Sequence, residues 1–418
     1  MSIPPGKIDA LIERAVFDPD DKVREESRKN IRELAHTNGI LPASIQGLYE
    51  AAGKGLYSGV SVPAINIRGI TYQVARAVFR AALKDNVGAF IFEIARSETG
   101  YTKQRPGEYT ACVLAAAVRE GFKGPVFIQG DHYQVSQKKY IADPDTEIDT
   151  IKDLIRESVE AGFYNIDIDA STLVDIEAPT LEKQQEKNYS VTAELTEFVR
   201  SIEPAGVTVS VGGEIGEVGK RNSTVEELRA FMTGYRSVLK PKLKGISKIS
   251  VQTGSTHGGV VLPDGSIADV QLDFKTLEKL SKAAKEEYGM GGAVQHGAST
   301  LPEDAFGLFS QVGTAEVHLA TGFQNIIYDS PSFPKELMDE INQHLLVNYV
   351  SERKEDQTDQ QFLYKTRKKA FGDFKKQIWD LSEENLTKIG TELEDRFSLL
   401  FHKLNVVQTM DLVGKFVV

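Results

Sequence analysis

Histidine and carboxylate side chains stand beside glycines at several points in the middle of the chain, each at the end of a short apolar run. They are Asp131 and His132 in GDH, Glu214 in GGE, His257 in THGG and His296 in QHG. Three imidazoles with a neighbouring carboxylate suit a divalent ion such as Zn²⁺, which keeps an open position for substrate in catalytic sites. A single histidine would more simply cap a loop or bind a backbone carbonyl. Three at successive strand ends favour a metal site.

Two more apolar runs in this region carry ligand-type side chains. The run YNIDIDA places Asp167 and Asp169 two residues apart, so that in a strand both carboxylates point to one face. His318 lies in the run AEVHLA. We therefore count Asp169 and His318 as candidate members of the same site.

Asp131 is a candidate for proton transfer. It directly precedes His132, and adjacent residues of a regular strand point to opposite faces. Asp131 could thus face a substrate as general acid and base while His132 faces a metal. The alternative is an aspartate that only fixes the loop.

Several residues near the predicted strand ends could bind an anion. Ser299 and Thr300 precede a helix expected near Pro302, and free N–H groups at a helix N-terminus favour phosphate. Simple N-capping explains these two residues equally well. Gly258 and Gly297 allow the backbone to approach a ligand closely, with exposed N–H groups that can bind an anion.

Two residues with potential reactivity are interpreted as structural. Lys248 begins a predicted strand, at the end opposite to the rim where a Schiff-base lysine would be needed. The single cysteine, Cys112, lies in the apolar run TACVLAAAV and is expected to be a small buried hydrophobe. With one cysteine, the chain has no internal disulfide and no thiolate metal cluster.

These candidate residues must be positioned by a repeating unit of a short apolar run followed by a helical segment. Eight such alternating units predict a parallel α/β sheet closed into a (β/α)8 TIM barrel, whose active sites lie where strands end and loops begin. We expect an N-terminal helical extension over residues 1–57, the barrel catalytic domain over 58–330 and a C-terminal helical extension over 331–418. The eight expected strands are 61–66, 89–95, 126–130, 164–170, 207–214, 249–254, 292–297 and 315–320.

Composition excludes several classes of partner. The 418 residues include 49 basic and 60 acidic side chains, a net charge of -11 without a long basic run, which argues against nucleic-acid binding. No segment is long and apolar enough to span a membrane, and the first residues lack the pattern of a signal peptide. We expect a cytoplasmic protein with a small-molecule substrate.

Five motifs occur in order on the expected strands: GDH, IDAS, GGEIG, STHGG and QHGAST. With these motifs the chain resembles the class II (metal-dependent) ketose-bisphosphate aldolases over about residues 60–325, as a divergent member. Residues 88–175, with FEIARSETGYT, GDHYQ and AGFYNIDIDAS, also look like the tagatose-bisphosphate aldolase subunit that assists a catalytic partner.

The resemblance implies a role for each matching residue. Asp131 would exchange the proton of the cleaved hydroxyl, and Asn66 in PAIN would contact substrate. The ligands of Zn²⁺, or of another divalent metal ion, would be His132, His257 and His296, with Glu214 as an additional ligand. The substrate phosphate would be held by Ser299, Thr321, Gly258 and Gly297.

The sequence departs from the family pattern at three places. Val261 stands where a phosphate-binding lysine is usual, and the stretch after the last strand reads HLATG, without the usual asparagine and acidic residue. The acidic pair of the loop after Glu214 is replaced by GKRNST, which leaves Glu217 as a candidate for the enolisation base. Lys220 or Arg221 could compensate for the missing lysine.

We therefore expect an aldolase that reversibly cleaves a ketose phosphate or bisphosphate, fructose- or tagatose-bisphosphate-like, through a Zn-stabilised enediolate. The resemblance places it in glycolysis or related carbohydrate metabolism, and we expect a homo-oligomer, a dimer or larger. The alternative is a non-catalytic barrel subunit that stabilises a partner aldolase. This alternative predicts a decayed metal site.

Overall fold

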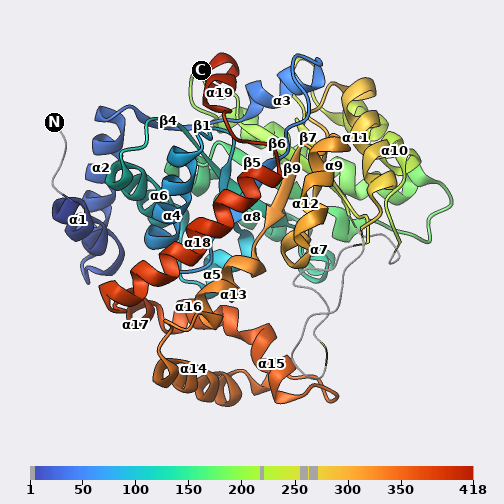
Figure 1. Ribbon diagram of the computed structural model, residues 1–418. Coiled ribbons are helices and arrows are strands. Elements are labelled where there is room, and N and C mark those ends of the chain that lie inside the picture. Colours follow the sequence, from blue (N-terminus) through green and yellow to red (C-terminus); the bar gives the residue numbers. More distant parts are fainter. Residues whose placement is uncertain (1–4, 217–220, 255–261, 263–271, 418) are drawn as a thin grey trace.

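Eight parallel strands close into a barrel in the computed structural model, which describes residues 5–216, 221–254, 262 and 272–417 (Figure 1). The hydrogen-bonded order runs β4-β3-β2-β9-β8-β7-β6-β5, and pairing of β4 with β5 closes the ring. The predicted (β/α)8 barrel is confirmed. Its strands are β2 (Val62–Asn66), β3 (Ile91–Ala95), β4 (Gly124–Gln134), β5 (Asn165–Asp169), β6 (Ser210–Gly216), β7 (Lys248–Val251), β8 (Ala293–Gln295) and β9 (Glu316–Leu319).

The strands form where the sequence has short β-branched and aromatic runs. Every residue of β2, β3, β5, β7, β8 and β9 is buried, as expected for strands covered by helices outside and packed side chains inside. Each of the eight expected runs overlaps one barrel strand, although the observed bounds differ by a few residues.

Helices connect successive strands and cover the barrel. Local signals set their ends: the Asp143 carboxylate caps α8 by accepting from the Thr146 N–H, Pro144 opens that helix, and Gly162 ends it at φ 98°. The connecting helices are α4 (Thr71–Lys84), α5 (Arg96–Tyr101), α6 (Pro106–Glu120), α7 (Gln137–Ala142), α8 (Pro144–Ala161), α9 (Leu181–Ile202), α10 (Val225–Val238), α11 (Phe274–Tyr288) and α12 (Phe306–Gln311).

The chain begins with α1 (Pro5–Phe17), α2 (Asp21–Thr37) and α3 (Gln46–Gly53). Between α2 and α3 lies a strand that sequence analysis missed, β1 (Ile40–Ala43). It pairs in parallel with the start of β4, Ile40 opposite Gly124. Its four residues include Pro42, and proline weakens the sequence signal for a strand.

After β9 the described residues form only helices. α18 lies along α4 across the front of Figure 1, where Arg80 Nε donates to Glu394 Oε2 at 2.7 Å. α14 and α15 extend below the barrel in the same view. These helices are α13 (Thr321–Asp329), α14 (Lys335–Asn348), α15 (Asp359–Thr366), α16 (Ala370–Asp373), α17 (Lys375–Trp379), α18 (Glu383–Lys403) and α19 (Met410–Phe416).

The C-terminal helices are seated tightly on the barrel rim beside α5. A Cβ added at Gly372 of α16 would overlap the carbonyl oxygen of Tyr101, and one added at Gly69 would overlap the ring of Phe371. Only glycine allows these two close approaches. The segment 366–373 is therefore held against the loop that follows β2.

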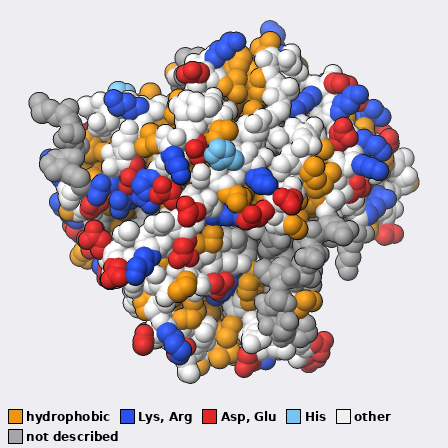
Figure 2. All heavy atoms as spheres, in the orientation of Figure 1, with side chains coloured by type: hydrophobic (Ala, Val, Ile, Leu, Met, Phe, Trp, Pro, Cys, Tyr) orange, Lys and Arg blue, Asp and Glu red, His pale blue; other side chains and the backbone are white. Residues whose placement is uncertain are grey.

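The surface has mixed charge. On the face in Figure 2, acidic and basic side chains are interspersed over the helices. Among the described residues, no helix is long and apolar enough to cross a membrane.

Candidate active site

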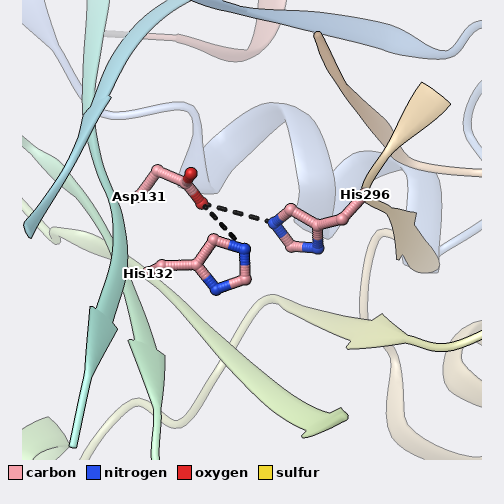
Figure 3. A group of neighbouring side chains, drawn as sticks. All are labelled: Asp131, His132 and His296. Atoms are coloured by element: carbon pink, nitrogen blue, oxygen red, sulfur yellow. Dashed lines mark hydrogen bonds and ion pairs between the residues drawn. The ribbon is translucent and has the colours of Figure 1, made fainter. Parts of the chain in front are cut away.

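Three of the predicted site residues meet at the carboxyl-terminal ends of β4 and β8. Asp131 Oδ1 lies 3.3 Å from His296 Nε2 and 3.9 Å from His132 Nε2. The two imidazole ring centroids are 4.1 Å apart. Figure 3 shows both rings turned toward the carboxylate from opposite strands.

A bulge in β4 lets Asp131 and His132 face the same space. The register with β5 shifts between Gly130 and Tyr133, and His132 adopts φ 42°, a left-handed conformation that is rare for a residue with a Cβ. In a regular strand the two side chains would alternate, as the sequence predicted. The bulge instead brings the side chains of both Asp131 and His132 into the barrel mouth. Strained backbone conformations of this kind are common at functional sites.

Two more carboxylates lie on the other side of His132. Its Nδ1 is 3.3 Å from Asp169 Oδ2 of β5 and 3.3 Å from Glu214 Oε2 of β6. Asp169 is anchored, because its Oδ1 accepts hydrogen bonds from the N–H and hydroxyl of Ser171. One ligand atom from each of His132, Asp169 and Glu214 lies within 4.8 Å of the others.

His318 joins the same group from β9. Its Nδ1 is 3.3 Å from Asp131 Oδ1 and 3.0 Å from Glu93 Oε2 of β3, and its ring centroid is 4.0 Å from that of His296. The structure therefore gathers Asp131, His132, His296 and His318 at one mouth of the barrel. His318, a candidate from the sequence, therefore lies with the other predicted site residues.

A buried ion-pair network lies beneath these residues in the barrel interior. Lys248 Nζ is 2.6 Å from Glu316 Oε1 and 3.0 Å from Asp167 Oδ2, and it donates to Gln129 Oε1 at 2.7 Å. A Cβ at Gly212 would overlap the Asp167 carboxylate, so the glycine provides the space for this pair. The interpretation of Lys248 as structural agrees with these contacts.

Lys248→Met is expected to lower the free energy of unfolding by about 3–5 kcal/mol, because it leaves buried carboxylates without their cation. Denaturant titration measures the loss. Lys279→Met, on the exposed face of α11, is the matched control and should change stability by less than about 0.5 kcal/mol. Equal losses in the two variants would show that the network contributes nothing.

The charges at the barrel mouth lower the pKa values of both His296 and Asp131. Burial, followed by the positive charges of His318 and His132, holds the pKa of His296 well below its usual value, so His296 is neutral, the form that binds metals. Burial alone would raise the pKa of Asp131, but His132 and His318 hold it well below its usual range. Asp131 is therefore ionised and can accept a proton.

The donor chemistry fits a divalent cation. The barrel mouth and the network beneath it contain six carboxylates, those of Glu93, Asp131, Asp167, Asp169, Glu214 and Glu316. Among the described residues, Lys248 is the one lysine or arginine in contact with any of them. Burial raises the pKa of Glu214 to about 7, with the charge of Asp169 as the next cause. A bound cation would relieve this excess of buried negative charge.

The other predicted site residues are partly assembled. Asn66, at the end of β2, donates to Glu98 Oε2 at 2.6 Å. Ser299 Oγ accepts the N–H of Ala320, next to Thr321 at the start of α13. Gly297 has φ 69°, a conformation suited to glycine. The predicted ligand His257 and the predicted phosphate contact Gly258 lie outside the described residues, as do Glu217, Lys220 and Val261.

Four polar residues of the interior and rim were not predicted from the sequence. Glu93 is the one polar residue of β3, and Gln129 and Glu316 each adjoin apolar residues of β4 and β9; a polar side chain beside such apolar residues was the available signal. Arg68 lies in the loop after Asn66 and belongs to none of the motifs in the sequence. It pairs with Glu98 at 2.7 Å.

The protein is a closed eight-stranded α/β barrel with histidines and carboxylates at the carboxyl-terminal ends of its strands, where the active sites of such barrels lie. Residues 44–387 match the family described as fructose-bisphosphate aldolase class-II. The chain belongs to this family, so the resemblance is confirmed. Membership supports a lyase-type enzyme, and the family generally uses a divalent metal.

Individual relatives are distant. A fructose-bisphosphate aldolase of Nostoc commune is 21% identical over 274 residues, which are 62% of this chain and 66% of the relative. The fructose-bisphosphate aldolase of Campylobacter jejuni superposes with a TM-score of 0.51 at 17% identity, covering 88% of this chain and 96% of that one. The fructuronate-tagaturonate epimerase of Cohnella laeviribosi gives 0.59 at 13%, covering 84% and 82%. These two structures support the fold alone.

Proposed function

We propose that the protein is a metal-dependent aldolase that reversibly cleaves a ketose phosphate or bisphosphate, fructose- or tagatose-bisphosphate-like. The observation that carries the proposal is the meeting of Asp131 with His132 and His296 in one barrel mouth, in a chain of the class II family. A decayed site, as expected of a non-catalytic subunit, would not preserve this donor set.

The metal would be held by His132, His257 and His296, with Glu214 as an additional ligand. Zn²⁺ is the expected ion, and when bound it supplies Lewis-acid polarisation of the substrate ketone. Neutral His296 is already in the ligand form. Burial alone would lower the pKa of His132, but the carboxylates of Asp131 and Glu214 raise it well above its usual value, so a metal ion would have to displace the proton of His132.

Asp131 performs the proton transfer of the cleavage. Its ionised carboxylate removes the proton from the hydroxyl next to the breaking carbon–carbon bond. The oxygen becomes the carbonyl of the departing aldehyde, and the bond's electron pair passes to the carbon beside the ketone. In synthesis Asp131 returns the same proton.

The test is metal analysis of the purified chain followed by a cleavage assay on phosphorylated and free ketoses. EDTA is expected to abolish cleavage, and added Zn²⁺ to restore it. Cleavage that persists in EDTA in a metal-free sample would contradict the proposal. Inactivity of the pure chain that is reversed by a second aldolase subunit would favour the alternative role of a stabilising partner.

Borohydride with substrate is expected to trap no lysine adduct. Burial alone would lower the pKa of Lys248, but the carboxylates of Asp167 and Glu316 raise it, so its amine stays protonated and is not a nucleophile. Mass spectrometry of the treated protein measures the adduct. An adduct on Lys248 would move the chemistry to a Schiff base.

A further inference from the structure

Arg68 is a mostly buried cation at the rim of the barrel, beside the candidate active site. Its side chain is 14% exposed, its Nε contacts Glu98 Oε1 at 2.7 Å, and its Nη1 donates to Gln324 Oε1 at 3.0 Å and lies 3.5 Å from Thr321 Oγ1. Its Nη2 makes no hydrogen bond with the described residues. This edge of the guanidinium remains available for a ligand.

Lys368 approaches the same place from the C-terminal helices. The contacts of Phe371 with Gly69 and of Gly372 with Tyr101 hold its segment at the rim. Its Nζ lies 5.5 Å from the centroid of the Tyr101 ring, and Tyr101 Oη is 3.4 Å from Glu98 Oε1. Arg68, Glu98, Tyr101 and Lys368 therefore form one contiguous group, the rim cluster.

The charge of Lys368 has no counter-ion in the described part of the chain, whereas its neighbours Arg367 and Lys369 pair with Asp329 and Glu352. Burial first, and then the charge of Arg68, lowers the pKa of Lys368. Glu98 is already engaged by Arg68, by Asn66 and by the N–H of Ala95. The rim cluster thus carries one surplus positive charge at a partly buried position.

The rim cluster adjoins the reacting groups. Glu98, the partner of Arg68, also accepts the N–H of Ala95, and Ala95 lies opposite Asp131 in the pairing of β3 with β4. Thr321 is the first residue of α13. The first N–H groups of a helix have no carbonyl acceptor in a preceding turn. Asn66 Oδ1 is buried without a hydrogen-bond partner among the described residues, so it can accept a substrate hydroxyl.

We propose that Arg68 and Lys368 form the subsite for an oxyanion group of the substrate, a phosphate or a carboxylate. The inference rests on the proposed function. It names the residues that would anchor the substrate in a chain where Val261 stands in place of the family's usual phosphate-binding lysine. The planar fork of Arg68 can bind two oxygens of either group, and Lys368 adds a second positive charge. The sugar chain would then extend past Asn66 to Asp131.

The test measures oxyanion binding separately from catalysis. Isothermal titration calorimetry of the metal-loaded protein uses inorganic phosphate and acetate as two probes. Lys368→Met and Arg68→Lys are each expected to weaken binding of the preferred probe by about 10- to 100-fold, the value of one charge-assisted hydrogen bond. Lys365→Met, exposed on the preceding helix, is the matched control and should bind as the parent does.

A second measurement uses cleavage rates. In both rim variants, the ratio of kcat/KM for a charged ketose to that for an uncharged ketose should fall by the same factor. Ketose phosphates and ketose acids tested side by side show which oxyanion source the subsite takes. Arg68→Lys keeps a cation beside Glu98, so a folded variant remains available.

The outcomes separate the two proposals. The parent protein could cleave no ketose and still bind an oxyanion that the rim variants do not bind. That result would support the subsite and contradict the proposed aldolase function. Cleavage with unchanged oxyanion binding and unchanged substrate ratio in both rim variants would overturn the subsite. So would a parent that binds neither phosphate nor acetate.

Discussion

His296→Ala is expected to reduce bound Zn²⁺ to a trace and to eliminate cleavage. His296 is buried, neutral and 3.3 Å from Asp131, so its removal takes away a ligand and not merely an outer contact. The loss of metal affinity should exceed the about 10- to 100-fold typical when only a hydrogen-bond partner of a ligand is removed. Elemental analysis and the cleavage assay measure the two effects on one sample.

His36→Ala is the matched control for this variant. His36 is exposed on α2, in the N-terminal segment and outside the barrel mouth. It should retain the metal content and the activity of the parent. Full metal occupancy in His296→Ala would mean that the ion, if bound, sits elsewhere.

Asp131→Asn is expected to lower kcat by about 10²- to 10⁴-fold, the usual contribution of one positioned proton-transfer group. Asparagine keeps the size of the side chain but cannot take the hydroxyl proton. The nearby positive charges of His132 and His318 keep the native carboxylate ionised, so the variant removes a ready base. Metal content, measured alongside, should stay near that of the parent.

The metal measurement decides how this result is interpreted. Asp131 lies 3.3 Å from both His296 Nε2 and His318 Nδ1, so it could orient a ligand instead of acting on substrate. Metal lost in proportion to activity would indicate that positioning role. Normal activity with normal metal would show that Asp131 transfers no proton in the rate-limiting step.

The fold followed from the sequence to a large extent. Eight apolar runs separated by helical segments are local patterns, and the barrel is the arrangement that buries all eight. The placement of His132, Glu214 and His296 at strand ends also followed, because the carboxyl ends of parallel strands share one rim. The missed strand β1 depends on a distant partner, the start of β4, which no local pattern reveals.

The details of the site were decided by tertiary structure. The bulge that turns Asp131 and His132 to one side depends on the register with β5. The pairing of Lys248 with Asp167 and Glu316 joins three strands across the barrel, and Lys368 reaches the rim cluster from far along the chain, through packing on Gly69 and Tyr101. The sequence by itself determined which side chains were available and which strand ends carried them. Only the tertiary structure decided which side chains share a charge environment, because electrostatic coupling depends on distance in space and on burial.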